Sequence, residues 1–222
     1  AERSAMPVRG ANMFVAPHRD DLQRIVVLNP KGGCGKTSLS TNIAAYFALN
    51  GPMPALVDCD PQGASMRWLE KRPKNRAPIH GVPAYKQFVN VTRTWQLRVP
   101  DETRQLVVDT PAGLDGPQIH ELVYDASNVI VPIMPSAIDT RSLAQLMRFL
   151  TILKIPPIAM LRDSQNFVEA AGSGIGVCEL PHHRARNDLD QLSAVFAWLE
   201  RTRLRRKQER DSMQRTRQDS VV

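Results

Sequence analysis

The feature that most constrains this chain is a glycine-rich turn between an apolar run and an amphipathic segment. Residues 24–29 form a short run of mainly apolar side chains, and the turn KGGCGKT follows at residues 31–37. Apolar side chains then recur at helical spacing through residues 37–50, and Gly51 supplies a C-terminal stop. The pattern predicts a strand, a loop and a helix in that order, with loop amides that can turn towards a phosphate.

Three later apolar runs predict further strands, at residues 55–57, 105–108 and 128–134. Apolar strands that alternate with amphipathic helices indicate an α/β fold with a mostly parallel sheet, covered by helices on both faces. Ligands of such sheets bind beyond the carboxyl ends of the strands. Three aspartates fall at those ends: Asp58, Asp60 and Asp109.

The pattern divides the chain into three parts. Residues 1–24 lack periodicity and are interpreted as a flexible arm, residues 25–200 as the folded domain and residues 201–222 as a basic tail. Further helices are predicted at residues 140–153, 164–171 and 189–206. The glycine-rich segment at 172–176 follows a helix instead of opening one, so we interpret it as a turn.

Composition excludes several classes of protein. A length of 222 residues with 42% hydrophobic content fits one domain with a full core. No apolar run approaches the roughly 20 residues that cross a bilayer, and residues 1–24 do not read as a signal peptide, so we expect a cytoplasmic protein. The cysteines Cys34, Cys59 and Cys178 lie far apart without metal-ligand spacing, and we expect reduced thiols.

The glycine-rich turn departs at one position from the common phosphate-binding pattern G-x-x-x-x-G-K-[ST]. Pro30 occupies the position of the leading glycine, whereas the last three residues of the turn fit the pattern. The two adjacent glycines have no Cβ to obstruct a phosphate. We expect nucleotide contacts from the loop and from one strand-end acid: Gly32, Gly33, Cys34, Gly35, Lys36, Thr37, Ser38 and Asp58.

Together these motifs resemble the deviant Walker ATPases of the ParA/MinD family, which position plasmids, chromosome loci, division machinery and protein organelles. Lys31 matches the family's signature lysine, which reaches the phosphates of the other subunit in an ATP-bound homodimer. Residues 58–63 (DCDPQG) match the switch I run, and residues 109–113 (DTPAG) match the Walker B and switch II run. The resemblance implies a P-loop NTPase fold and an ATPase with weak basal activity, with ATP and Mg²⁺ as cofactors.

Phosphoryl transfer needs charge neutralisation and in-line positioning, and each of these residues is assigned to one of these two needs. Lys36 neutralises the β- and γ-phosphate oxygens, and Thr37 with Asp109 holds the magnesium. Asp60 orients the attacking water. Lys31 supplies positive charge from the other subunit.

Two points stay open in the sequence. Asp58 either takes a direct catalytic part or caps the turn that follows its strand. The family normally continues through a helix and another strand whose end carries an adenine-reading asparagine, but here residues 140–153 lead directly into 154–161. About one βα unit, roughly 30 residues, is missing near residues 140–155. Either the sequence lacks a stretch of the protein or this member has a trimmed sheet.

The net charge of +7 is concentrated near the C-terminus, where residues 201–222 carry eight basic and three acidic side chains. Such a segment favours an anionic partner. Helical spacing places Arg201 and Arg205 on one face with Arg206 beside them. The predicted DNA contacts are Arg184, Arg186, Arg201, Arg203, Arg205 and Arg206.

Three functions fit the resemblance. The preferred one is an ATPase that dimerises with ATP, binds nucleoid DNA non-specifically and positions a cargo with a ParB-like or McdB-like adaptor that stimulates hydrolysis. The alternative is a MinD-like protein on a membrane surface, but the basic tail lacks the sustained apolar face that this requires, and we expect no stable membrane insertion. A relative of the nitrogenase iron protein is disfavoured, because neither Cys34 nor Cys59 is placed to bridge a cluster across a dimer.

Overall fold

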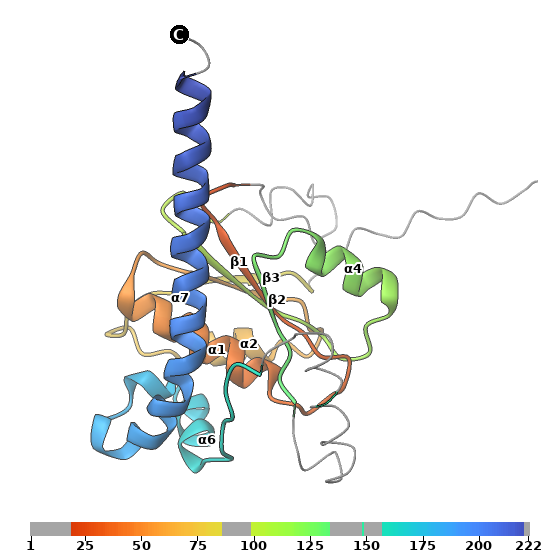
Figure 1. Cartoon of the computed structure of the whole chain (residues 1–222). Helices are drawn as coiled ribbons and strands as arrows, with labels where there is room; N and C mark the ends of the chain where they lie inside the picture. Colours follow the sequence, from red (N-terminus) through yellow and green to blue (C-terminus); the bar gives the residue numbers. More distant parts are fainter. Residues whose placement is uncertain (1–18, 86–98, 134–147, 149–156, 220–222) are drawn as a thin grey trace, which may run out of the picture.

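The computed structural model describes residues 19–85, 99–133, 148 and 157–219, and within them a parallel sheet of five strands forms the centre (Figure 1). The strands are β1 (Gln23–Val27), β2 (Ala55–Asp58), β3 (His80–Pro83), β4 (Gln105–Asp109) and β5 (Asn128–Ile130). Their order across the sheet is β3-β2-β4-β1-β5, and every neighbouring pair is parallel. The predicted α/β class with a parallel sheet is therefore confirmed.

Helices cover both faces of this sheet because its central strands are apolar on both sides. Ile25 and Val27 of β1 belong to one buried cluster, whereas Val26 of the same strand belongs to the other. The helices of the described chain are α1 (Lys36–Asn50), α2 (Ala64–Glu70), α4 (Gly116–Tyr124), α6 (Gln165–Gly172) and α7 (His182–Asp219), with a short 3₁₀ turn η2 (Val177–Glu179).

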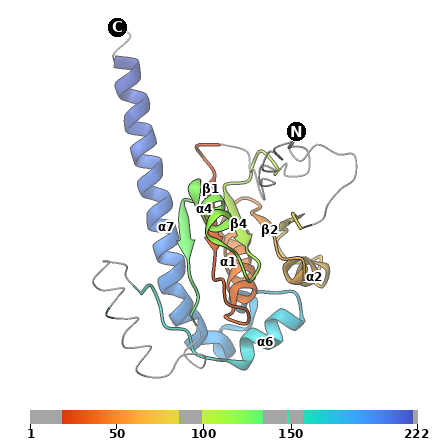
Figure 2. The ribbon, with the colours of Figure 1, turned by 90° about the vertical axis from the view of Figure 1, so that its right-hand side faces the viewer.

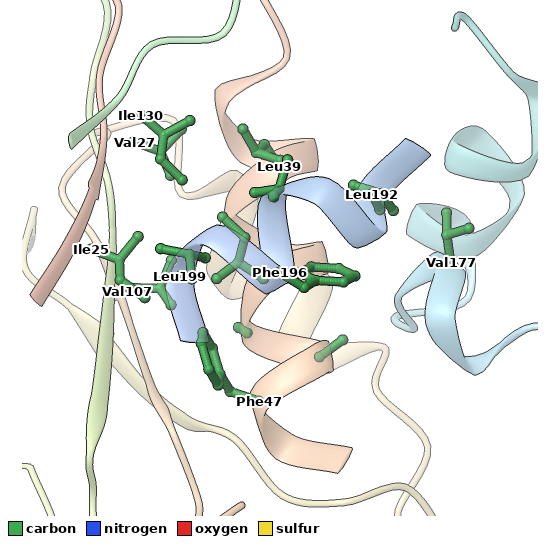
Figure 3. Close-up of a cluster of buried hydrophobic side chains, with 14 of the residues drawn as sticks. Ile25, Val27, Leu39, Phe47, Val107, Ile130, Val177, Leu192, Phe196 and Leu199 are labelled. Atoms are coloured by element: carbon green, nitrogen blue, oxygen red, sulfur yellow. The ribbon is translucent and has the colours of Figure 1, made fainter. Parts of the chain in front are cut away.

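The larger cluster lies between the sheet, α1 and the first half of α7 (Figure 3). Leu192 and Leu199 of α7 are fully buried members of this cluster. Phe196 stacks on Tyr46 of α1, with 3.9 Å between ring centroids and an interplanar angle of 8°. Burying each of these large apolar side chains contributes about 1.5–3 kcal/mol, so α7 is fixed to the domain along this half.

The opposite face of the sheet is covered by α4. This helix begins with a capping box, in which the Asp115 side chain accepts from the Gln118 amide and the Gln118 side chain accepts from the Asp115 amide. Leu114 and Leu122 then pack into the second cluster with Val26 and Val108. The cap satisfies amides that a helix start leaves without partners, which fixes where α4 begins.

One helix of 38 residues, α7, takes the place of the shorter helix expected at residues 189–206. It begins at His182, not near Leu189, and the carbonyl of Pro181 accepts from the first amides of the helix, those of Arg184 and Ala185. Asp188 in this first part is buried, and its carboxylate accepts from Arg162, Ser164 and Asn166. The helix continues to Asp219, beyond the end expected at Arg206 and across the expected domain boundary at residue 200. Its second half extends past the sheet and the other helices (Figure 2).

Among the smaller sequence predictions, one turn is confirmed, one strand is shorter than expected and three elements were not predicted. The turn at 172–176 is confirmed, since it connects α6 to η2, and Gly174 there has φ +67° with the backbone of Arg72 2.5 Å from where a Cβ would lie. The strand expected at 128–134 is shorter, because β5 ends at Ile130. The sequence did not predict β3, α2 or α4.

The helix expected at 140–153 and the missing βα unit fall almost wholly outside the described residues. Within the described chain, no helix has the length and apolar character to cross a membrane.

Candidate nucleotide-binding site

The strand-end aspartates meet at one edge of the sheet. Asp109, the last residue of β4, stands in register opposite Val27 of β1 on one side and Asp58 of β2 on the other. Because all three strands are parallel, their carboxyl ends share this edge, and the glycine-rich loop leaves β1 there. The edge therefore combines two buried carboxylates with a phosphate-binding loop.

The loop reaches its shape through two left-handed glycines and the lysine that opens α1. Gly33 has φ +70° and Gly35 has φ +85°, a region that side chains with a Cβ rarely adopt. The buried Lys36 amine donates to the Lys31 carbonyl at 3.1 Å, and the Cys34 thiol donates to the same oxygen at 3.2 Å. The loop thus keeps the positive charge of Lys36 within its curve, where a phosphate would need it.

Asp109 is surrounded by hydroxyl groups. Thr37 donates to its Oδ2 atom at 2.8 Å and Ser65 to the same atom at 2.7 Å, while Ser40 donates to Oδ1 at 3.3 Å. Burial raises the pKa of Asp109 to about 6, against the lowering effect of these hydrogen bonds. A buried carboxylate that is costly to ionise becomes a strong ligand for a cation that neutralises it.

The Thr37 and Asp109 pair fits a magnesium ion. Mg²⁺ usually takes one or two protein oxygens and completes its shell with phosphate oxygens and water, so it does not need a cage of acids. No group of three or more His, Cys, Asp or Glu side chains that could hold a metal is found in the described residues. The donors present here therefore suit a metal that arrives with a nucleotide.

Asp58 anchors the switch I turn. This position favours the alternative that Asp58 caps the turn after its strand over a direct catalytic part. Its Oδ1 atom accepts from the Asp60 amide and its Oδ2 atom from the Met66 amide, each at 3.1 Å. The side chain has no exposed surface, and this burial raises its pKa, while the two amides lower it. Asp58 thereby ties the loop and the first turn of α2 to the end of β2.

Asp60 and Lys31 differ from the buried residues because each is accessible to solvent. Asp60 is partly exposed, and its Oδ1 atom accepts from the Gln62 amide at 2.9 Å. Lys31 has an exposed side chain, and its backbone amide donates to the side chain of Asn29 at 2.9 Å. The loop thus uses the backbone of Lys31, at the amide and at the carbonyl that receives Lys36. Ser38, also predicted to contact nucleotide, is exposed at the start of α1.

Ser40 and Ser65 are the site residues that the sequence reasoning missed. Ser40 follows Thr37 by three positions on α1, and this spacing alone places both hydroxyls on one face of the helix. Ser65 has no such local signal. It reaches Asp109 only because α2 starts directly after the turn that Asp58 anchors.

The predicted DNA residues do not form one patch. Arg184 and Arg186 belong to the first turns of α7, not to a preceding loop, and lie roughly 25 Å along the helix from Arg201. Arg184 also pairs with Glu169 at 2.5 Å. They therefore do not lie in a loop close to Arg201, and their contact with DNA stays a prediction.

The remaining predicted arginines divide between two sides of α7. Arg205 shares a face with Arg201 and pairs with Glu209 at 2.9 Å. On another side, a stripe at positions i, i+3, i+4 and i+7 faces a cavity of about 350 Å³ beside the start of β1. We call it the basic stripe, and its members are Arg203, Arg206, Lys207 and Arg210.

A phosphate loop that leads from β1 into α1, with a threonine bonded to the aspartate at the end of β4, defines a P-loop nucleotide-binding domain. The family model described as the CobQ/CobB/MinD/ParA nucleotide binding domain matches residues 25–212, and the chain belongs to this family. This confirms the resemblance seen in the sequence motifs.

Curated relatives match parts of the chain. Maintenance of carboxysome distribution protein A of Halothiobacillus neapolitanus is 34% identical over 118 residues, which cover 52% of each chain. The chromosome-partitioning ATPase Soj of Thermus thermophilus is 46% identical over 54 residues, 24% of this chain and 22% of Soj. The chain spans about half the length of the carboxysome distribution relatives it matches.

Solved structures also align with this chain, at TM-scores below 0.5. The structure of pNOB8 ParA bound to nonspecific DNA aligns with a TM-score of 0.38 and 16% identity, over 64% of this chain and 62% of that one. The cobyrinic acid a,c-diamide synthase of Mycobacterium smegmatis, with bound ADP and magnesium, aligns with a TM-score of 0.38 and 20% identity, over 60% and 68%.

Proposed function

We propose that this chain is a ParA-type ATPase that hydrolyses ATP with Mg²⁺ and dimerises when ATP is bound. The observation that carries the proposal is the 2.8 Å contact between Thr37 and Asp109 beside the buried amine of Lys36. These groups supply a hydroxyl and a carboxylate for the metal and a cation for the phosphates, which phosphoryl transfer requires. Asp60 and Lys31, at the accessible rim, are assigned to water positioning and to the phosphates of the partner subunit.

The cellular role we propose is to position or segregate a cargo, either a DNA locus or a protein organelle such as a carboxysome. Membership of the ParA family and the similarity to carboxysome-distribution and chromosome-partitioning proteins support this role. A ParB-like or McdB-like adaptor would stimulate the weak basal hydrolysis. The protein would then act in the cytoplasm, associated with the nucleoid.

Non-specific DNA is the proposed surface on which the ATP dimer acts. The second half of α7 presents arginines and lysine in an extended helix, and phosphate neutralisation needs only such cations. The exposed apolar side chains on this half, Leu204 and Met213, are nine positions apart and do not form a continuous apolar face. This favours DNA over the MinD-like alternative of a membrane surface.

The experiment that tests the proposal measures nucleotide, oligomer and DNA together in the purified chain. We expect ATP hydrolysis that requires Mg²⁺, a dimer with ATP but not with ADP, and binding to duplexes of unrelated sequence that weakens steeply with salt. Chain that neither binds nor hydrolyses ATP would refute the nucleotide function. Preferential binding of the ATP form to anionic liposomes over DNA would replace the nucleoid role with the membrane one.

A further inference from the structure

The carboxylate of Asp109 is held by hydroxyl groups from two different helices. Thr37 and Ser40 belong to α1, which continues directly from the phosphate loop, whereas Ser65 belongs to α2. Thr37 and Ser65 donate to the same oxygen, at 2.8 and 2.7 Å. The contact with Ser65 is therefore the direct side-chain link between α2 and the proposed metal site.

This carboxylate has little capacity for a further donor. A carboxylate oxygen accepts about two hydrogen bonds, and two hydroxyls already occupy Oδ2. Asp109 has no exposed surface, so solvent does not reach the open position on Oδ1. A metal ion, or a water bound to it, can approach Asp109 only when one of the hydroxyls moves.

Ser65 is the hydroxyl of the three that does not belong to the helix that continues from the phosphate loop. Thr37 is itself assigned to the metal, and Ser40 lies one turn further along the same helix. Ser65 is fully buried and lies two residues after Gly63, the N-cap of α2, which has φ +64°. It is also adjacent to Met66, whose amide is bound to Asp58, so its release loosens the start of α2 and the turn that carries Asp60.

We propose that Ser65 is a positioning residue that leaves Asp109 when Mg²⁺ binds, and that this exchange transmits metal occupancy to α2 and to the loop of Asp60. The inference rests on the proposed function, because it assumes that Asp109 serves a nucleotide-bound metal. In the metal-free protein, Ser65 holds the carboxylate and α2 together. With the metal bound, the charge of Asp109 is neutralised by the cation and α2 is released to move the water-positioning residue.

Hydrogen exchange in residues 64–70 tests this exchange without relying on turnover. The protein is loaded with a non-hydrolysable ATP analogue, first in EDTA and then with Mg²⁺. Wild-type protein should exchange faster in α2 after Mg²⁺ is added. Ser65→Ala should exchange faster already in EDTA and should show no further change with Mg²⁺. Ser40→Ala opens Oδ1 of the same carboxylate and leaves Ser65 on Oδ2, so α2 should exchange as in wild type in EDTA but should no longer exchange faster when Mg²⁺ is added.

The Mg²⁺ requirement of each variant is a second measurement, and it separates failure of this inference from failure of the proposed function. Removing the competing hydroxyl should lower the Mg²⁺ concentration that half-saturates the thermal stabilisation by the analogue, by about three- to tenfold, the equivalent of one hydrogen bond. An unchanged magnesium requirement in Ser65→Ala, together with a wild-type response of α2, would overturn the inference. In that case nucleotide binding by the wild-type chain would still support the proposed function, whereas its absence would remove both.

Discussion

Asp58 and Asp109 are partners in register at the last positions of β2 and β4, and neither side chain has any exposed surface. Two buried carboxylates on adjacent strands are costly to ionise, and burial raises the pKa of both, to about 6 for Asp109. The charge of Asp58 adds to the shift of Asp109. The two buried carboxylates thus destabilise this edge of the sheet, and any cation that binds there stabilises it.

Replacing Asp109 by asparagine should therefore stabilise the nucleotide-free protein. The pKa of Asp109 is higher in the folded state than its ordinary value of 3.8, so the unfolded chain ionises first as the pH rises from about 4 to 6. Wild type loses free energy of unfolding over this range, at most about 3 kcal/mol from this group, and Asp109→Asn does not. Urea unfolding at several pH values, without metal or nucleotide, measures the difference between the two proteins.

Asp188→Asn provides a control in which the substitution should change the stability in the opposite direction. The hydrogen bond from Arg162 lowers the pKa of Asp188, so its ionised form stabilises the folded state above the unfolded pKa. The variant should be less stable than wild type at neutral pH, and the difference should shrink as the pH falls below about 4. A stability difference for Asp109→Asn that does not grow between pH 4 and 6 would contradict the assigned effect of burial.

Lys36→Ala should abolish nucleotide binding. Lys36 is the buried cation of the loop, and its loss removes charge-assisted hydrogen bonds worth about 1.5–3 kcal/mol each. We expect affinity for ATP, measured by calorimetry, to fall by roughly a hundredfold or more. Near-native affinity in this variant would show that the loop does not hold the phosphates.

Asp60→Ala should bind ATP and dimerise, but turn over slowly. The substitution removes a partly exposed carboxylate and leaves the loop and the Asp109 cluster intact. Loss of a group that positions water or accepts its proton lowers turnover by about 10²–10⁴-fold. Single-turnover hydrolysis measures the step, with ATP affinity as the control, and wild-type turnover would exclude the assigned role.

Lys31→Ala should bind ATP yet remain a monomer. The loop uses the carbonyl of Lys31 to receive Lys36 and Cys34, and alanine keeps this carbonyl. Only the exposed amine, assigned to the partner's phosphates, is lost. Sedimentation with a non-hydrolysable ATP analogue measures the oligomer, and the matched control is Lys74→Ala, another exposed lysine on the connection between α2 and β3. An ATP-dependent dimer of Lys31→Ala would exclude the cross-subunit assignment.

The basic stripe should contribute most of the DNA affinity of α7. Alanine at Arg206, Lys207 and Arg210 removes three cations from one side of the helix, and each lost phosphate contact lowers the salt slope by about 0.9. We expect at least a tenfold loss of DNA binding at low salt, measured by fluorescence anisotropy with the ATP form.

The control for the stripe is a triple variant of equal charge on another side of α7. Helical spacing places Arg201, Arg205 and Arg215 together there. Each variant removes one paired arginine, Arg205 with Glu209 here and Arg210 with Asp211 in the stripe. This variant should retain most of the DNA affinity. Equal losses in the two variants would mean that DNA binding follows total charge and not the position of the stripe.

The nucleotide edge could be predicted because its signals are local. The apolar run before the loop, the two glycines with positive φ and the aspartates at the strand ends all fall within short windows. The contact of Ser65 with Asp109 could not be predicted, since it joins residues 44 positions apart and depends on where α2 starts. Similarly, β3 contains Gly81 and Pro83, which are poor strand residues, and it forms because it pairs with β2 at the edge of the sheet.

The ends of α7 escaped prediction for another reason. Residues 182–188 have one buried apolar side chain, Ala185, so the helical period is absent there although Asp188 fixes the turn. Beyond Arg206 the helix has no core to face and therefore no apolar stripe. It continues on residues of high intrinsic helix propensity and on pairs such as Arg205 with Glu209.

The length of α7 has a mechanical consequence. Leu199 is fixed in the core, and the helix runs on for 20 residues to Asp219, roughly 30 Å at 1.5 Å per residue. A tilt of about 10° at this fixed point would displace the far end by roughly 5 Å, close to the rise of one helical turn. A small repacking of Phe196 against Tyr46 would therefore be amplified along the helix and would displace its far end relative to the sheet.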